Sequence, residues 1–213
     1  MITGNYFQLC ELMTESQQEI DQIKAAILAA AQERFRGFGY GKTTMAEIAE
    51  DVNMSAANLY RYFHNKQDIA TECTGLCMAD LDAELDKVVN LPNLDSTQRL
   101  HLYVQTAMRH YYEMMHDVPR LHELIESITS NYPQLIHDKN EKSERQIASI
   151  LQQGVDEGEF EIAHIKITAS AVSKATVLFS TPFFMQIYSI EEFEKMAVNV
   201  VSLIINGLRK TTQ

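Results

Sequence analysis

Side chains suited to contacts with nucleic acid are concentrated in one short segment, residues 55–66. Its first residues are small or carry an amide: alanine methyls at Ala56 and Ala57 can meet a thymine methyl, and Asn58 can pair with adenine. Hydroxyl and cationic groups that suit phosphate oxygens follow at Tyr60, Arg61, Tyr62, His64 and Lys66. This order of residue types is typical of a recognition helix in the DNA major groove.

The residues around this segment predict two short helices joined by a tight turn. Thr44 and Glu47 have the spacing of a capping box at the start of the first helix, and Ser55 can cap the second. Asn53 lies between them and tolerates the left-handed backbone that ends many helices. Two helices joined in this way form a helix-turn-helix. The spacing alone leaves open a second interpretation, a helical hairpin whose tyrosines only pack.

Residues 20–70 resemble the DNA-binding domain of the tetracycline-repressor (TetR) family. The similarity lies in consecutive motifs at residues 37–44, 48–49 and 55–66. The chain departs from the family at Asn53, where glycine is usual, and asparagine is the best substitute for that backbone. The resemblance implies phosphate contacts from Thr44, Tyr62 and Lys66 and groove contacts from residues 55–60. The predicted DNA-binding set is Lys42, Thr43, Thr44, Ser55, Ala56, Ala57, Asn58, Tyr60, Arg61, Tyr62 and Lys66.

Composition and charge limit the remaining classes. No apolar run approaches the ~20 residues of a membrane span, no secretory signal is visible, and three cysteines cannot form an even disulfide framework, so we expect a cytoplasmic protein without membrane contacts. The net charge of −11 argues against indiscriminate binding to nucleic acid. Residues 20–70 hold six basic and six acidic side chains, whereas residues 71–213 hold twelve and twenty. A charge-balanced N-terminal part joined to an acidic remainder of the chain favours binding of DNA in one orientation.

Helical periodicity and caps along the whole chain predict an all-α protein of about nine helices. We expect an N-terminal arm over residues 1–16, a three-helix DNA-binding domain over 17–66, and a helical effector-binding and dimerisation domain over 67–213. Ser16 and Glu19 have capping-box spacing, so the first helix is predicted to start there and to end near Gly37. The later helices are predicted at about 65–89, 97–116, 119–130, 134–157, 163–181 and 189–208.

Two apolar rows near the C-terminus predict a homodimer interface. Helical spacing relates their members, which are Ile167, Ala171, Ala175, Leu178, Phe193, Met196, Ala197, Val200 and Ile204. The alternative is that both rows pack on their own subunit. The family resemblance favours a two-fold, four-helix interface, because a palindromic operator requires paired heads.

Large adaptable apolar side chains in the body predict a pocket for an apolar or aromatic effector, although each alone could be ordinary core. They are Tyr103, Met108, Tyr111, Tyr112, Met115, Phe179, Phe183 and Phe184. The histidine spacing of the body does not suit a metal site, and no cofactor is expected. No catalytic triad, nucleophile elbow or HExxH motif occurs, so no enzyme is expected.

These predictions together describe a homodimeric regulator that binds a palindromic operator in double-stranded DNA and represses until a small molecule releases it. Two alternatives stay open at this point. One is a DNA-binding regulator without an effector, and the other is a helical enzyme whose head merely resembles the family.

Overall fold

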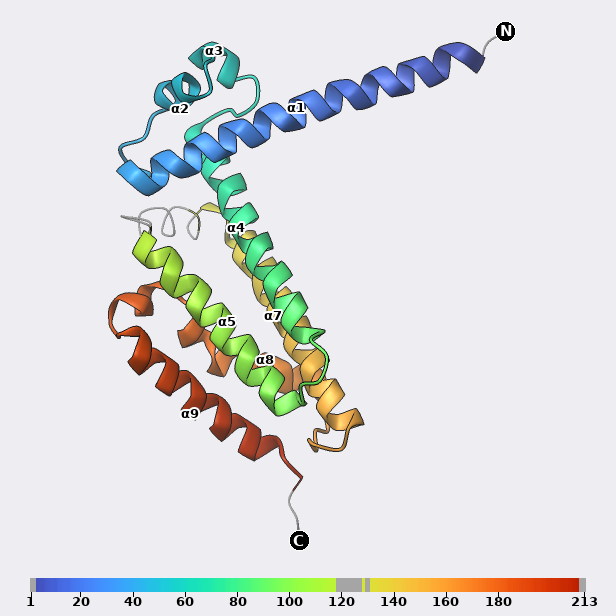
Figure 1. The fold of residues 1–213 in the computed structure, drawn as a ribbon, viewed down its shortest axis with the longest axis vertical. Helices are drawn as coiled ribbons and strands as arrows, with labels where there is room; N and C mark the ends of the chain where they lie inside the picture. The colour runs from blue at the N-terminus through green and yellow to red at the C-terminus, as the bar shows by residue number, and fades with distance from the viewer. Residues whose placement is uncertain (1–2, 118–127, 129–130, 211–213) are drawn as a thin grey trace. The chain divides into compact units, whose positions relative to one another are not determined.

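The computed structural model describes residues 3–117, 128 and 131–210, and these residues form helices without a named strand (Figure 1). The predicted all-α fold class is confirmed. The helix predicted at 119–130 lies outside the described residues, apart from Ile128. The helices are α1 (Thr3–Phe38), α2 (Met45–Asp51), α3 (Ala56–Leu59), α4 (Lys66–Val89), α5 (Ser96–Asp117), α7 (Pro133–Asp156), α8 (Ile165–Ala175) and α9 (Ile190–Leu208), with two short 3₁₀ helices, η1 (Val177–Ser180) and η2 (Pro182–Gln186).

Two predicted helix boundaries are wrong. The first helix starts at Thr3, so Ser16 lies inside α1 instead of capping it, because leucine, methionine, glutamate and glutamine favour helix through this stretch. The eighth helix ends at Ala175 instead of near residue 181. There the Thr176 hydroxyl donates to the Val172 carbonyl at 2.9 Å, and the chain continues as η1.

The chain divides into two compact units, residues 1–74 and 75–213. The division falls inside α4, beyond the domain boundary predicted near Lys66. In the first unit, called the head, α1 packs on α2 and α2 packs on α3. Its buried side chains include Ile27, Ala31, Phe35, Ile48, Leu59, Phe63 and Ile69. The predicted inward face of the second short helix, Leu59 and Phe63, is confirmed.

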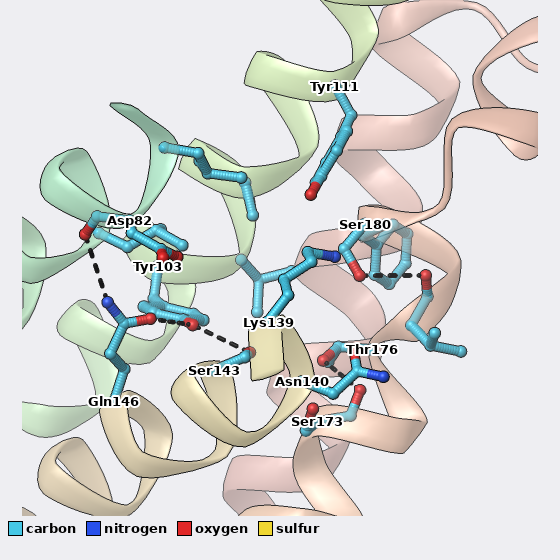
Figure 2. Close-up of a pocket in the computed structure, with 16 residues that line it drawn as sticks. Asp82, Tyr103, Tyr111, Lys139, Asn140, Ser143, Gln146, Ser173, Thr176 and Ser180 are labelled. Atoms are coloured by element: carbon cyan, nitrogen blue, oxygen red, sulfur yellow. Dashed lines mark hydrogen bonds between the residues drawn. The ribbon is translucent and has the colours of Figure 1, made fainter. Parts of the chain in front are cut away.

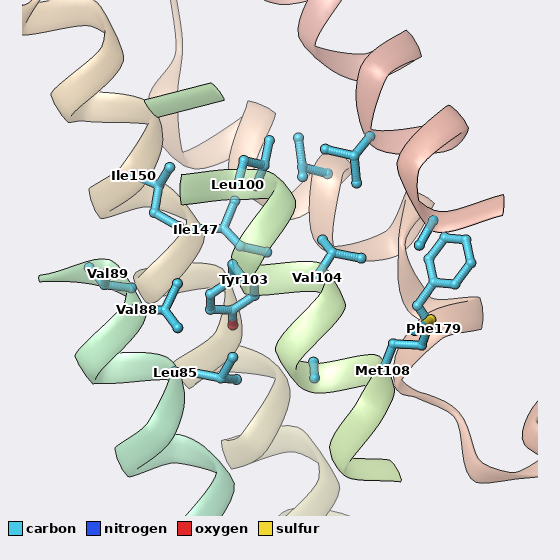
Figure 3. Close-up of a cluster of buried hydrophobic side chains, with 14 of the residues drawn as sticks. Leu85, Val88, Val89, Leu100, Tyr103, Val104, Met108, Ile147, Ile150 and Phe179 are labelled. Carbon is cyan, nitrogen blue, oxygen red and sulfur yellow. The ribbon is translucent and has the colours of Figure 1, made fainter. Parts of the chain in front are cut away.

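The second unit, called the body, is organised around α5. This helix packs on α7 and α9, which lie on either side of it in Figure 1, and α7 in turn packs on α8. Figure 3 shows side chains of α4, α5, α7 and η1 meeting in one core, with Leu85, Leu100, Ile147 and Phe179 among them. Because α4 contributes to this core, any change in the packing of the body acts directly on that helix.

Two polar side chains, the buried Arg99 and the half-buried Glu159, fix the ends of α4 and α5. The guanidinium of Arg99 donates through Nη1 to the carbonyls of Val89 at 3.0 Å and Leu91 at 2.6 Å, so it satisfies groups at the C-terminal end of α4. The Glu159 carboxylate accepts from the backbone N–H groups of Ser96 and Thr97 at 2.9 and 3.1 Å, at the start of α5. Arg99 therefore anchors the end of α4 to α5.

Candidate functional site

The first short helix of the head starts at the predicted capping box. The Thr44 hydroxyl accepts from the Glu47 N–H at 3.3 Å, and the Glu47 carboxylate accepts from the Thr44 N–H at 2.8 Å. The Thr44 hydroxyl also donates to the Glu47 carboxylate at 2.7 Å, and this bond together with the one from the Thr44 N–H holds the pKa of Glu47 below its usual value. Both the start of α2 and the position of the exposed Thr44 are thereby fixed.

The turn between α2 and α3 is a Schellman motif. Asn53 has a φ of 54°, in the left-handed region, and its N–H donates to the Glu50 carbonyl at 3.0 Å. The N–H of Met54 donates to the Ala49 carbonyl at 2.9 Å. Asparagine accepts this conformation more readily than other side chains, which confirms the backbone predicted at Asn53.

The second short helix presents its polar side away from the head core. Ser55 accepts from the Asn58 N–H at 3.2 Å, as predicted for its cap. The helix α3 has one regular turn, and the Phe63 N–H continues the pattern by donating to the Leu59 carbonyl at 3.1 Å. Because Leu59 and Phe63 are buried, Ala57, Tyr60 and Arg61 are exposed. The side chains of Ala56, Asn58 and Tyr62 are half-buried beside them.

Arg34 ties α1 to α2 and is therefore occupied within the head. Its Nη2 donates to Asp51 at 2.8 Å, and its Nη1 lies 3.4 Å from the Glu47 carboxylate. The hydrogen bond from this guanidinium holds the pKa of Asp51 below its usual value. The exposed cations nearest the two short helices in sequence are then Lys42 and Arg61.

Two members of the predicted DNA-binding set face inward. Thr43 is 2% exposed and its hydroxyl donates to the Gly39 carbonyl at 3.0 Å, so the prediction of a DNA contact by this side chain is wrong. The Lys66 ammonium donates to the carbonyls of Tyr40 and Thr43 at 2.6 and 2.7 Å. This lysine holds the connection between α1 and α2, a role that the sequence analysis missed. Carbonyls of a glycine-rich connection lack helical partners, and that need was the available signal.

A cavity of about 50 Å³ opens in the body, and Figure 2 shows its lining. Its wall includes three of the predicted residues, Tyr103, Tyr111 and Phe179. The others do not line it: Met108 is fully buried in the core, and Tyr112, Met115 and Phe184 pack against that core. Phe183 lies in η2, and its side chain is outside the described part of the structure.

Several polar groups of the cavity come from α7 and were missed. Lys139, Ser143 and Gln146 recur at the spacing of one helix face, which was a readable signal. Gln146 accepts from the Tyr103 hydroxyl at 2.9 Å and donates to Asp86 at 2.6 Å. The cavity is therefore mixed in character: polar side chains of α7, α8 and η1 line it together with apolar side chains of α4 and α5, and α4 also contributes Asp82.

The C-terminal helices carry exposed apolar side chains. Ile167, Ala171 and Ala175 are exposed on α8, and Leu203, which was not predicted, is 74% exposed on α9. Leu178, Met196, Val200 and Ile204 are half-buried. Phe193 and Ala197 are buried in the core of their own body unit, so their assignment to a dimer interface is wrong.

Two negative findings apply to the described residues alone. No group of three metal-ligating side chains occurs among them. No described helix is both long and apolar enough to cross a membrane.

Comparisons with known proteins match both units. The family model described as bacterial regulatory proteins, tetR family, matches residues 27–73, and the one described as tetracyclin repressor-like, C-terminal domain, matches residues 96–201. The HTH-type transcriptional regulator YhgD of Bacillus subtilis is 24% identical over 139 residues, which cover 63% of this chain and 68% of that protein.

Solved structures share the fold. A transcriptional regulator from Cytophaga hutchinsonii superposes with a TM-score of 0.68 at 24% identity, over 86% of this chain and 97% of that one. A TetR-family regulator from Pectobacterium atrosepticum has the same TM-score at 16% identity, over 92% of this chain and 98% of that one.

Proposed function

Because the chain belongs to the TetR family of transcriptional regulators, we propose that it acts as a homodimer on a palindromic operator and leaves that operator when a small molecule enters the body cavity. DNA binding and transcriptional regulation follow from the family. The operator, the effector and the repressing sign are the proposal. A regulator of its own chromosome works in the cytoplasm, and we assign no catalytic activity to it.

The exposed side of α3 is the observation that supports the DNA contacts most strongly. Two confirmed N-terminal caps, Thr44 on α2 and Ser55 on α3, fix the helices that present it. Ser55, Ala57 and Tyr60 are exposed at the start of α3, where a recognition helix meets base edges. Ala56 and Asn58 complete the groove set. Phosphate contacts are assigned to Lys42, Thr44, Arg61 and Tyr62, while Lys66 acts from within the head by holding the connection that carries Lys42 and Thr44.

Dimerisation brings two such heads to one operator. Regulators of this family dimerise, and a two-fold axis repeats the same surface on both subunits. The exposed rows of α8 and α9 supply apolar side chains for that surface, chiefly Ile167, Ala171, Ala175 and Leu203. Small residues on α8 permit close approach of a partner helix.

The cavity supports the effector part of the proposal because α4 forms one wall. Leu81, Asp82 and Leu85 line it, and the same helix continues into the head unit. A ligand that fits one arrangement of α4 better than another shifts the population of head positions. The small volume supports one alternative, a regulator of this family without an effector, because a cavity of about 50 Å³ holds little more than a few waters without expansion.

The proposal is tested with a matched pair of charge insertions. Ala57→Glu places a carboxylate on the exposed side of α3, where it repels DNA phosphates, while Ala83→Glu makes the same change at an exposed position of α4 within the body. Fluorescence anisotropy on DNA from upstream of the gene should show binding lost in the first variant and kept in the second. Equal binding by both variants would remove α3 from the DNA interface.

A further inference from the structure

Lys139 places a cation in the wall of the body cavity, and no described carboxylate forms an ion pair with it. It lies on α7, it is half-buried, and its ammonium stands 5.0 Å from the ring centroid of Tyr111. Among the described residues no carboxylate forms an ion pair with it and no acceptor takes a hydrogen bond from it. Lys142, less than one turn away, holds the neighbouring carboxylates of Asp82 and Asp86 at 3.2 and 3.5 Å.

Tyr111 adds a second unused donor. Its side chain is 7% exposed and lines the cavity, yet its hydroxyl has no hydrogen bond to another described residue. In Figure 2 this hydroxyl points down into the space that also holds the Lys139 nitrogen. Tyr103, by contrast, is committed to Gln146 and Ser143 at 2.9 and 3.1 Å. Because this hydroxyl has no protein acceptor among the described residues, it can donate to a ligand in the cavity without breaking a hydrogen bond within the protein.

The remaining wall includes the apolar side chains of Val104, Ala107 and Phe179, and Ser180 also lines it. We propose that the effector, on the function proposed above, is a small monocarboxylate: one oxygen accepts from Lys139, the other from Tyr111, and the apolar wall covers the hydrocarbon part. This replaces the purely apolar or aromatic effector expected from the sequence.

The charges around the cavity and its volume limit the chemical class of the ligand. Lys139, which forms no ion pair with a described carboxylate, matches a ligand with one negative charge, whereas Asp82 on the same wall and the acidic body oppose a dianion. A neutral ligand would cover Lys139 and leave its charge without a partner, which is unfavourable. A volume of about 50 Å³ favours acids of few carbons.

The affinity should depend on pH in a defined direction. Burial lowers the pKa of Lys139 below that of an exposed lysine. A bound carboxylate favours the charged amine and raises this pKa again, so binding takes up the proton that Lys139 has lost at high pH. Carboxylate affinity is therefore full below the pKa of Lys139 and falls as the pH rises through it.

The test uses full-length protein and two matched pairs of probes, butyrate with butyramide and propionate with propionamide, at equal sodium concentration. Thermal unfolding reports binding, because a ligand that binds only the folded state raises Tm. At least one acid should raise Tm clearly more than its amide. Lys139→Met should weaken the binding of that acid at least about tenfold and should remove the preference for the acid over its amide, as expected for a lost hydrogen bond to a charged group. Tyr111→Phe should weaken the binding of the acid by a factor of a few.

The control is Lys195→Met, the same substitution at an exposed position on α9, which should keep the preference for the acid. The proposal is overturned if neither acid raises Tm above its amide, or if Lys139→Met keeps the preference. Operator binding is followed in parallel by anisotropy. If an amide releases DNA and neither acid does, the cavity is still an effector site, but the proposal that its ligand is a carboxylate is wrong. If the wild-type protein binds no DNA in the anisotropy experiment, the proposed function is wrong. The Tm comparison between acids and amides still decides the class of ligand in that case.

Discussion

Replacing Arg99 by methionine tests how the end of α4 is held. The guanidinium is 7% exposed and donates to four backbone carbonyls, those of Val88, Val89, Leu91 and Leu94, at 3.3, 3.0, 2.6 and 2.7 Å. No carboxylate pairs with it among the described residues, so these carbonyls and the C-terminal dipole of α4 balance its charge. Methionine retains the hydrophobic stem and removes every donor.

The size of the effect follows from these contacts. A hydrogen bond to a charged group contributes about 1.5–3 kcal/mol, but the four are not additive and the surrounding turn is exposed enough to hydrate some carbonyls. We expect a loss of about 3–5 kcal/mol in the free energy of unfolding, as for other broken buried charge sites. At about 2–4 °C per kcal/mol for a chain of this length, Tm should fall by roughly 6–20 °C.

Circular dichroism at 222 nm measures this shift at matched protein concentration. Arg109→Met is the control, because Arg109 forms a 2.8 Å ion pair with Glu194 but is 54% exposed. A surface pair of this kind contributes less than about 1 kcal/mol, so Tm should fall by under about 4 °C. Arg99→Lys should lie between the two, since an ammonium reaches fewer of the carbonyls. Equal shifts for Arg99→Met and Arg109→Met would refute the anchoring role.

Three further predictions concern the interface, a close contact in the body, and acid stability. Leu203→Glu should weaken dimerisation about 10³-fold in sedimentation, since two symmetry-related leucines lose about 2 kcal/mol of burial each; an unchanged dimer would place the interface elsewhere. Gly154→Ala should lower Tm because its methyl overlaps the Phe160 ring, whereas Gly75→Ala, in open space inside α4, should raise it; shifts of the same sign would contradict this packing. The lowered pKa of Asp51 means that its stabilising effect is full above the ordinary carboxyl pKa and is lost as the pH falls through the lowered value, so Asp51→Asn should flatten the acid unfolding profile.

Features encoded by neighbouring residues could be predicted from the sequence. The capping box at Thr44, the cap at Ser55 and the left-handed turn at Asn53 depend on side chains and backbone within one helical turn, and all three are confirmed. The same pattern at Ser16 gave a false start, because a serine and a glutamate three residues apart also fit inside a continuous helix. A local signal therefore identifies a possible cap, and the preceding residues decide whether a helix begins there.

Features that depend on contacts between distant residues could not be predicted. The sequence predicted a phosphate contact for Lys66, whereas in the structure its ammonium donates to the carbonyls of Tyr40 and Thr43, more than twenty residues away in the chain. The cavity was expected from its large apolar residues, yet its distinguishing group is Lys139, and only the packing of α5 against α7 shows that no described carboxylate forms an ion pair with it. Phe193 had the right spacing for an interface but faces its own core.

The most direct test of the account is a titration of the purified wild-type protein against DNA from upstream of its gene, followed by fluorescence anisotropy at two salt concentrations. We expect saturable binding that weakens at the higher salt and survives an excess of random DNA, because base contacts from α3 add to phosphate contacts. Absence of binding at either salt, or binding removed equally by random DNA, would contradict operator recognition by this head.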